Sequence, residues 1–244
     1  MIDASLSLSN TPDHVRFEGA SLPRFEHEPL LETFDGLDGK IGIFGLSADP
    51  IQNGHIALAL QAKEELGLDC VVFMPAKRNP LKSHSTFASD NDRLEMIRGA
   101  LKEHPDLYVC PIELNRDGKI VSYTVDSIKT IRSQAAPSAH LTLLMGEDTL
   151  MTLPKWKAIQ TLIGLVDQFS VAARGSFPQT AYEDLRSSLG DEAYAKVTAH
   201  LFPPPGKALS STAVRAAFAR GETPSDSLPP SVLQYILEHG LYRP

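Results

Sequence analysis

The 244-residue sequence has little cysteine, few aromatic residues and no excess of positive charge. It contains two cysteines, one tryptophan and 7% aromatic residues, and its formal net charge is -7. Because polyanion-binding surfaces need a broad excess of lysine and arginine, this charge argues against nucleic acid or an anionic membrane as the main partner. A small local group of cations remains compatible with binding a single phosphate.

Long apolar runs are also missing. No stretch is long enough to span a bilayer, and the first residues, MIDASLSL, lack the cationic flank and apolar run of a signal peptide. Cys70 and Cys110 fall in apolar runs that are typical of strands, so we expect buried reduced thiols rather than a disulfide or a metal pair. These absences predict a cytoplasmic protein without a membrane partner.

The remaining composition is that of a soluble globular protein, with 42% hydrophobic and 22% charged residues. The length suits one α/β domain with a short appendage. Residues 1–38 have no sustained periodicity, so we expect an N-terminal extension that is partly disordered or docked through scattered apolar residues such as Leu30 and Phe34. Residues 39–244 are expected to form the main domain.

From Ile41 onward, short apolar runs alternate with longer amphipathic ones. This alternation is typical of repeated βαβ units, so we expect an α/β fold with a doubly wound, mostly parallel sheet and flanking helices. The expected strands are Ile41–Gly45, Cys70–Pro75, Leu107–Leu114, His140–Gly146 and Gln168–Ala173, with a weaker one at Lys196–Phe202. The expected helices cover residues 54–66, 90–103, 123–135, 155–163, 180–189, 211–220 and 230–239.

The loop after the first strand, residues 45–55, reads GLSADPIQNGH and leads into an amphipathic helix. Backbone N–H groups and the positive end of a helix dipole would face this loop, which favours an anion site. Gly54 would allow a phosphate to approach the backbone, and His55 would present an imidazole to it. The spacing fits neither a Walker P-loop nor a G-x-G-x-x-G motif. The alternative is a plain strand-to-helix turn with a surface histidine.

Two further segments have polar residues at places where ligands bind. Ser210, Ser211 and Thr212 form a helix N-cap signal with Arg215 one turn later, which indicates either a capped surface helix or a phosphate site. Asp148 follows the fourth strand, where a carboxylate can accept hydrogen bonds from ribose hydroxyls or cap a helix.

The 45–55 loop resembles the signature G-G-[ST]-F-[DN]-P-x-H-x-G-H of the nicotinate-nucleotide adenylyltransferases, which belong to the [HT]-x-G-H nucleotidyltransferases. Other segments resemble this family in the same order across residues 40–244. They are MPA at 74–76 with Pro80 and Lys82, SYTVD at 122–126, GED at 146–148 with Trp156, LSSTAVR at 209–215, and the closing segment 230–242. Chance agreement across so many ordered segments is improbable.

The resemblance implies a Rossmann-like nucleotidyltransferase fold and adenylyl transfer from ATP to nicotinate mononucleotide. The products would be the deamido-NAD dinucleotide and pyrophosphate, in a step of NAD biosynthesis. Mg²⁺ would arrive with ATP, held mainly by phosphates and water, and no dedicated metal-ligand cluster is expected. Assembly into a homo-oligomer is compatible with the sequence but leaves no signal in it.

The resemblance also assigns residues to the site. Catalysis would involve His55 and Gln52. The expected ATP-binding residues are Gly45, Ser47, Gly54, His55, Gly146, Asp148, Ser210, Ser211, Thr212 and Arg215. The expected mononucleotide-binding residues are Lys82, Tyr123, Thr124, Trp156 and Arg174, with the tryptophan ring as a stacking surface for the pyridine.

Four positions depart from the family pattern. Gln52 replaces a histidine and can donate a hydrogen bond to phosphate without carrying charge. Leu46 replaces a glycine, adds a side chain to the loop and disfavours a positive φ. Ala48 stands for the usual phenylalanine, and Leu81 for a histidine.

These departures leave two alternatives open. The chain could use another acceptor, such as nicotinamide mononucleotide or a non-pyridine phosphate, or it could be a nucleotide-binding paralogue with a degenerate site. An active enzyme is the favoured hypothesis because most of the family's polar residues remain. Those residues are His55, Asp148, Ser211, Thr212 and Arg215.

Overall fold

The computed structural model describes residues 28–78, 80–81, 86–116, 121–204 and 210–243. Lys82, a predicted mononucleotide-binding residue, and residues 1–27 of the predicted extension lie outside the described residues. Within the described part, no helix is long and apolar enough to cross a membrane.

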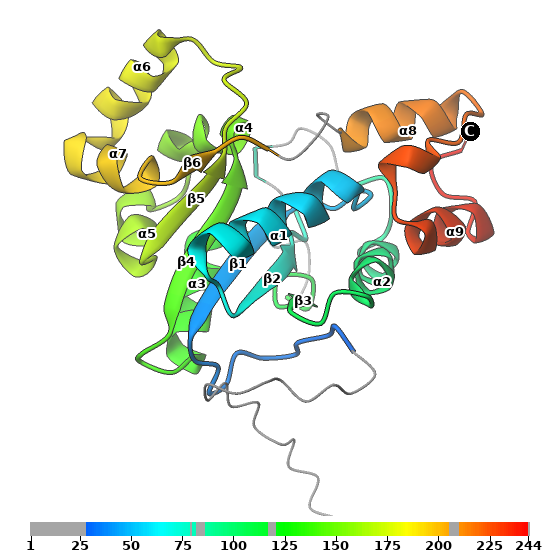
Figure 1. The fold of residues 1–244 in the computed structure, drawn as a ribbon, viewed down its shortest axis with the longest axis horizontal. Coiled ribbons are helices and arrows are strands. Elements are labelled where there is room, and N and C mark those ends of the chain that lie inside the picture. Colours follow the sequence, from blue (N-terminus) through cyan, green and yellow to red (C-terminus); the bar gives the residue numbers. More distant parts are fainter. Residues whose placement is uncertain (1–27, 79, 82–85, 117–120, 205–209, 244) are drawn as a thin grey trace, which may run out of the picture.

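Six strands form one parallel sheet in the order β3-β2-β1-β4-β5-β6 (Figure 1). The strands are β1 Lys40–Leu46, β2 Cys70–Pro75, β3 Leu107–Val109, β4 His140–Gly146, β5 Gln168–Ala172 and β6 Leu201–Phe202. This order places β1 and β4 side by side, with the chain winding outward from them in both directions. The predicted doubly wound parallel sheet is confirmed. Ligands bind such sheets at the carboxyl ends of the strands where the order reverses.

Helices cover both faces of this sheet (Figure 1). Alternate residues of a strand point to opposite faces, and accordingly Val72 and Met74 join one apolar cluster while Val71 and Phe73 join the other. The first cluster contains residues of α3 Thr124–Gln134, α5 Ile159–Leu165, α6 Gln179–Leu189 and α7 Asp191–Val197. The second contains residues of α1 Asn53–Leu66, α2 Asp90–Leu101, α8 Ser211–Ala219 and α9 Pro230–Glu238. Shorter elements are α4 Glu147–Leu150, η1 Leu153–Lys155 and η2 Ser225–Ser227.

Two predicted strands were wrong in extent. The strand expected at Leu107–Leu114 ends at Val109, because Pro111 has no N–H for a ladder and the following residues form a turn closed by Asn115 N–H on the Pro111 carbonyl at 2.9 Å. The strand expected at Lys196–Phe202 is helix α7 up to Val197, and only Leu201–Phe202 pairs with the sheet.

The helix expected over residues 155–163 is divided in two. A 3₁₀ turn, η1, holds Pro154 in its first turn, where the missing N–H costs no hydrogen bond. Ala158 then adopts a left-handed conformation with φ 49°, and α5 begins at Ile159. The left-handed residue separates the two elements and explains why no continuous helix forms there.

The described part of the predicted extension packs on the domain. Leu31 N–H donates to the Val109 carbonyl at 2.9 Å, and Leu30 forms a parallel bridge with Val109 beside the sheet edge. Phe34 is fully buried. Residues 29–31 therefore lie along the edge strand β3, and residues 34–37 bond to the end of α3. The division at residue 39 stays a prediction.

Candidate active site

A large cavity opens at the carboxyl ends of β1 and β4, where the strand order reverses. Its volume is about 1620 Å³. Pockets for one small ligand typically measure roughly 300–1,000 Å³, so this cavity has room for two nucleotide-sized molecules.

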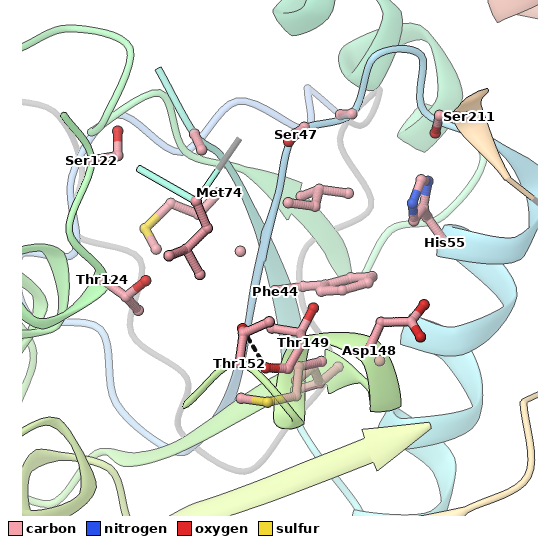
Figure 2. A pocket seen from close by; sticks show the side chains of 18 of the residues that line it. Phe44, Ser47, His55, Met74, Ser122, Thr124, Asp148, Thr149, Thr152 and Ser211 are labelled. Carbon is pink, nitrogen blue, oxygen red and sulfur yellow. Dashed lines mark hydrogen bonds between the residues drawn. The ribbon is translucent and has the colours of Figure 1, made fainter. Parts of the chain in front are cut away.

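The structure gathers the predicted site residues around this one cavity. Every predicted residue that the structure describes is on its wall, and only Lys82 lies outside the described residues. The lining residues are Gly45, Ser47, Gln52, Gly54, His55, Tyr123, Thr124, Gly146, Asp148, Trp156, Arg174, Ser210, Ser211, Thr212 and Arg215. Figure 2 shows His55, Asp148 and Ser211 on one side and Ser122 and Thr124 on the other, with Phe44 between them.

We call residues 45–55 together with 210–215 the β1 wall, and residues 122–124 together with 152–157 the α3 wall. Two glycines at the β1 and β4 strand ends are not required by protein packing, because a Cβ at Gly45 or Gly146 would meet no atom within 4 Å. By contrast, a Cβ at Gly42 would lie 2.9 Å from the Leu68 side chain. The open space at the two strand ends therefore belongs to the cavity.

His55 is held in one orientation by the start of α1. Its Nδ1 accepts a hydrogen bond from the Gln52 backbone N–H at 3.2 Å, and its ring lies edge-on to Phe44 at 6.1 Å between centroids. Because Nδ1 is the acceptor, the neutral ring carries its proton on Nε2. This arrangement makes His55 a hydrogen-bond donor through Nε2.

Gln52 links the two segments of the β1 wall. It is 4% exposed, and its side-chain amide donates to Ser211 Oγ at 3.4 Å. Ser211 Oγ in turn donates to the Pro50 carbonyl at 3.0 Å. The amide that was predicted to donate to phosphate thus has one proton engaged by Ser211. The Gln52 Oε1 atom has no hydrogen-bond partner in the described part of the chain.

The unusual residues Leu46 and Ala48 have different environments. Leu46 is the last residue of β1, paired with Pro75, and its φ is not positive, in keeping with what a leucine favours. The left-handed position in this loop is Ala48, with φ 48° and 2% exposure. The Leu46 side chain lines the cavity, so it adds a side chain to the loop as expected.

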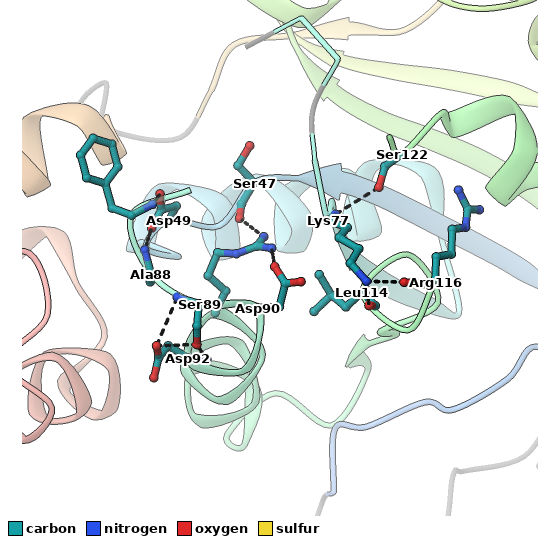
Figure 3. Close-up of polar contacts among 12 residues, drawn as sticks. Ser47, Asp49, Lys77, Ala88, Ser89, Asp90, Asp92, Leu114, Arg116 and Ser122 are labelled. Atoms are coloured by element: carbon teal, nitrogen blue, oxygen red, sulfur yellow. Dashed lines mark hydrogen bonds and ion pairs between the residues drawn. The ribbon is translucent and has the colours of Figure 1, made fainter. Parts of the chain in front are cut away.

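A buried carboxylate and a buried guanidinium hold the loop from behind (Figure 3). Asp49 accepts hydrogen bonds from the backbone N–H groups of Phe87 at 2.8 Å and Ala88 at 3.1 Å. Arg93, which is fully buried, donates to the Ser47 carbonyl at 2.7 Å and to Asp90 at 2.6 Å. The loop is therefore fixed by residues outside the signature as well as by those within it.

The start of α8 combines capping with contacts to the loop. Ser210 Oγ accepts from the Ala213 N–H at 3.4 Å, which is the predicted N-cap contact. Arg215 donates to the Asp49 carbonyl at 2.5 Å, and its guanidinium lies 4.5 Å from the Phe87 ring centroid. Arg215 thus reaches from α8 across to the loop after β1.

Asp148 and Glu147 differ although they are neighbours. Gly146 caps α4, so the alternative of an N-cap role for Asp148 was wrong. The Asp148 carboxylate lines the cavity and makes no hydrogen bond or ion pair with the described residues. Glu147 is 3% exposed and accepts from the Tyr182 hydroxyl at 2.6 Å and from the Arg174 N–H at 2.8 Å. Burial alone would raise the pKa of Glu147, but these hydrogen bonds bring it below its ordinary value.

The α3 wall presents aromatic rings and a helix start. Tyr123 is the N-cap residue of α3 and Thr124 its first residue, with no side-chain cap on the helix. The Trp156 indole N–H donates to Thr152 Oγ1 at 3.1 Å, which fixes the ring. Lys157 Nζ lies 4.4 Å from the Tyr123 ring centroid. An uncapped helix start beside two aromatic rings suits a flat ligand with a negative group.

Buried Glu113 supports the α3 wall from below. It is 3% exposed and accepts from Ser127 Oγ at 2.5 Å, and Arg116 donates to the same hydroxyl at 2.9 Å. Burial is the main cause that raises the pKa of Glu113. Ser122 Oγ accepts from the Lys77 N–H at 3.1 Å, so the start of α3 is also tied to the segment after β2.

The Lys77 side chain bonds to the loop after β3. Its Nζ donates to the carbonyl of Leu114 at 3.1 Å and to that of Arg116, as Figure 3 shows. The ammonium therefore ties the segment after β2 to the loop after β3.

Three buried carboxylates were not identified from the sequence as site residues: Asp49, Glu113 and Glu147. Each supports a cavity wall through partners that are distant in the chain, such as the 27 positions between Glu147 and Arg174. A single acidic residue in a sequence gives no sign of burial, because its partners belong to other elements. Among the described residues no group of three or more His, Cys, Asp or Glu could hold a metal ion.

The parallel sheet, the cavity at its switch point and the anion-suited helix starts are those of a Rossmann-like nucleotide-binding fold. A family model described as cytidylyltransferase-like matches residues 43–217, so the chain is a nucleotidyltransferase of this fold.

Individual relatives identify the family within the nucleotidyltransferases. The chain is 36% identical over 203 residues to the probable nicotinate-nucleotide adenylyltransferase of Neisseria meningitidis serogroup B, covering 83% of this chain and 98% of that protein. It is 37% identical over 204 residues to the protein of the same name from Bordetella petrii, covering 84% and 99%. The chain belongs to the nicotinate-nucleotide adenylyltransferase family.

Solved structures share the fold. A Plasmodium falciparum nicotinic acid mononucleotide adenylyltransferase complexed with NaAD aligns with a TM-score of 0.63 and 19% identity, covering 84% of this chain and 97% of that one. A putative nicotinate-nucleotide adenylyltransferase from Vibrio parahaemolyticus aligns with a TM-score of 0.56 and 17% identity, covering 84% and 95%.

Proposed function

We propose that the protein transfers the adenylyl group of ATP to nicotinate mononucleotide, forming the deamido-NAD dinucleotide and releasing pyrophosphate. The 5′-phosphate of the acceptor attacks the α-phosphate of ATP, and the bond from that phosphorus to the bridging oxygen of pyrophosphate breaks. The reaction needs alignment and charge neutralisation rather than a covalent nucleophile.

One observation carries this proposal: two differently built walls face a single cavity of about 1620 Å³. The β1 wall offers two helix starts and Arg215, which suit a triphosphate. The α3 wall offers the rings of Tyr123 and Trp156, which suit a pyridine. Relatives at 36–37% identity are named probable nicotinate-nucleotide adenylyltransferases, which supports the same pair of substrates.

The residues of the β1 wall would act on ATP. His55, donating through Nε2, would stabilise charge on the α-phosphate in the transition state. The hydroxyls of Ser210, Ser211 and Thr212, together with Arg215, would bind the β- and γ-phosphates.

The β4 end and the nearby glycines complete the ATP site. Asp148 would accept hydrogen bonds from the ribose hydroxyls. Gly45 and Gly146 leave room for the nucleotide. Gly54 lines the same cavity at the start of α1, and Ser47 lies at the loop's entry. Mg²⁺ would enter as part of the ATP complex, as the hard cation that phosphates and water hold best.

The residues of the α3 wall would bind the acceptor. Trp156 and Tyr123 would contact the pyridine ring, and Thr124, at the uncapped start of α3, would face the ring carboxylate. Arg174 would bind the mononucleotide phosphate, with Lys82 as its predicted second cation.

The test is a coupled assay of the purified protein with ATP, Mg²⁺ and one of three acceptors: nicotinate mononucleotide, nicotinamide mononucleotide or ribose 5-phosphate. We expect pyrophosphate and dinucleotide in equal amounts with nicotinate mononucleotide and much slower turnover with the other two. Turnover only with another acceptor would replace the proposed substrate. ATP binding without turnover on any acceptor would favour a nucleotide-binding paralogue.

A further inference from the structure

Asp49 joins four parts of the chain at the back of the β1 wall. It belongs to the loop after β1, and its carboxylate accepts from Phe87 and Ala88 N–H groups just before α2. Its backbone carbonyl accepts from Arg215 of α8 at 2.5 Å. The fourth contact comes from the C-terminal end of the chain, where the Tyr242 hydroxyl donates to Asp49 Oδ1 at 2.8 Å.

Tyr242 is committed to this contact by its surroundings. Its backbone is left-handed, with φ 63°, a conformation that costs free energy for a residue other than glycine. Its ring packs 6.3 Å from the Phe218 ring of α8. Burial and the nearby Asp49 carboxylate raise the pKa of Tyr242 far above its ordinary value, so the hydroxyl stays a donor at any working pH.

The bond between Tyr242 and Asp49 is connected to the ATP side of the cavity through Asp49 itself. Asp49 and Arg215 both line it, and they are joined through the Asp49 carbonyl. Without the tyrosine hydroxyl, the 5%-exposed carboxylate would keep two backbone donors among the described residues, and the loop carrying that carbonyl would be less firmly held.

We propose that Tyr242 is a positioning residue of the ATP site, which holds the loop after β1 and Arg215 in the geometry that binds the triphosphate. The C-terminal segment thereby becomes part of nucleotide binding without touching the nucleotide. This inference rests on the proposed function, because it takes the β1 wall as the ATP side.

The test compares two tyrosines that each lose one hydroxyl. Tyr242→Phe removes the donor to Asp49, whereas Tyr235→Phe removes a donor to Asp92 at 3.0 Å, on α2 and away from the cavity lining. Binding of a non-hydrolysable ATP analogue is measured by calorimetry, and steady-state KM values are measured for ATP and for nicotinate mononucleotide.

We expect Tyr242→Phe to weaken analogue binding and raise the ATP KM about tenfold, because it removes a hydrogen bond to a buried charged group. The acceptor KM should stay within twofold, and Tyr235→Phe should change neither KM. Equal effects of the two variants, or equal changes in both KM values, would show a general structural role and overturn the inference.

The wild-type measurement separates this inference from the proposed function. If the wild type does not bind the ATP analogue, both fail. If it binds the analogue and Tyr242→Phe binds equally well, only the positioning role fails.

A double-mutant cycle gives a second test, which also serves if Tyr242→Phe unfolds. Asp49→Asn should raise the ATP KM in the same direction. The double variant should be no worse than the more affected single variant, because the bond between Tyr242 and Asp49 is disrupted in each variant and can be lost only once. Additive effects in the cycle, or an unchanged ATP KM in folded Asp49→Asn, would overturn the inference.

Discussion

The two walls of the cavity are held in different ways. The β1 wall departs from its family signature at Leu46, Ala48 and Gln52, and it is tied together by bonds between distant segments, such as Ser211 to Pro50 at 3.0 Å. The α3 wall follows the family pattern at residues 122–124 and rests on the compact network around Glu113.

A signature residue can be replaced where the new side chain keeps the contact between the two segments of the wall. In the β1 wall, Gln52 bonds to Ser211, so the segment remains connected to α8 although the family histidine is missing. The residues that hold the walls, Asp49 and Glu113, are buried carboxylates that accept hydrogen bonds. Asp49 accepts from Phe87, Ala88 and Tyr242, and Glu113 accepts from Ser127. Removing one partner of such a group leaves a buried charge undersatisfied, so substitution there should be costlier than at the cavity surface.

The largest expected effect is on the β1 wall. His55→Ala should lower kcat at least about a hundredfold, because it removes a donor aimed at developing charge, with little change in the acceptor KM. His239→Ala, at the end of α9, is the matched control and should leave kcat within twofold. A near-normal rate for His55→Ala in steady-state kinetics would remove this residue from the mechanism.

The next largest effect is expected on the α3 wall, where a substitution should change the KM of the acceptor and not that of ATP. Trp156→Ala should raise the KM for nicotinate mononucleotide about tenfold through lost ring contact, while the ATP KM stays unchanged. Thr152→Val keeps the indole ring but removes the hydroxyl that accepts its N–H and that donates to the Thr149 carbonyl at 2.7 Å, so it should have a smaller effect on the same KM. If both substrates' KM values rise together for Trp156→Ala, the division into two walls is wrong.

Smaller effects are expected from adding a methyl group at two glycines of β1, one facing the cavity and one packed against other side chains. Gly45→Ala should weaken ATP binding several-fold in calorimetry with little loss of stability, because its Cβ would meet no protein atom. Gly42→Ala should instead destabilise the fold by about 1–3 kcal/mol, because its Cβ would press on Leu68 and Leu144. Unchanged ATP binding in Gly45→Ala would contradict the assignment of that space to the nucleotide.

The smallest effect is a pH dependence of stability at Glu147. Its lowered pKa means that its stabilising contribution is present above the ordinary value of 4.5 and is lost as pH falls through the lower folded value. Tyr182→Phe should therefore lower the free energy of unfolding by about 1.5 kcal/mol at pH 7, and the difference from wild type should shrink in acid. Urea titrations at pH 7 and pH 3 measure this, and a difference that grows in acid would refute it.

The sequence predicted the sheet and the lining of the cavity well, because both depend on local patterns. Strand periodicity and the loop after β1 are local signals, and the described residues predicted from them surround one cavity. The strand predicted at Lys196–Phe202 was wrong at its start for a local reason as well. Apolar composition alone does not distinguish the end of α7, at Val197, from a strand.

Contacts between distant segments were beyond the sequence. Tyr242 and Asp49 are 193 positions apart, and neither carries a local sign of the other. The left-handed φ of Ala48 likewise depends on the loop's tertiary contacts, since alanine has no intrinsic preference for it.

Adenylyl transfer within this cavity is tested most directly by following the phosphates of ATP. The protein is incubated with nicotinate mononucleotide and Mg²⁺ together with ATP labelled in either the α- or the γ-phosphate. We expect the α-label in the dinucleotide and the γ-label in pyrophosphate, and we expect His55→Ala to slow the appearance of both. Transfer of the γ-label to the acceptor, or release of γ-label as free phosphate without a dinucleotide, would contradict it.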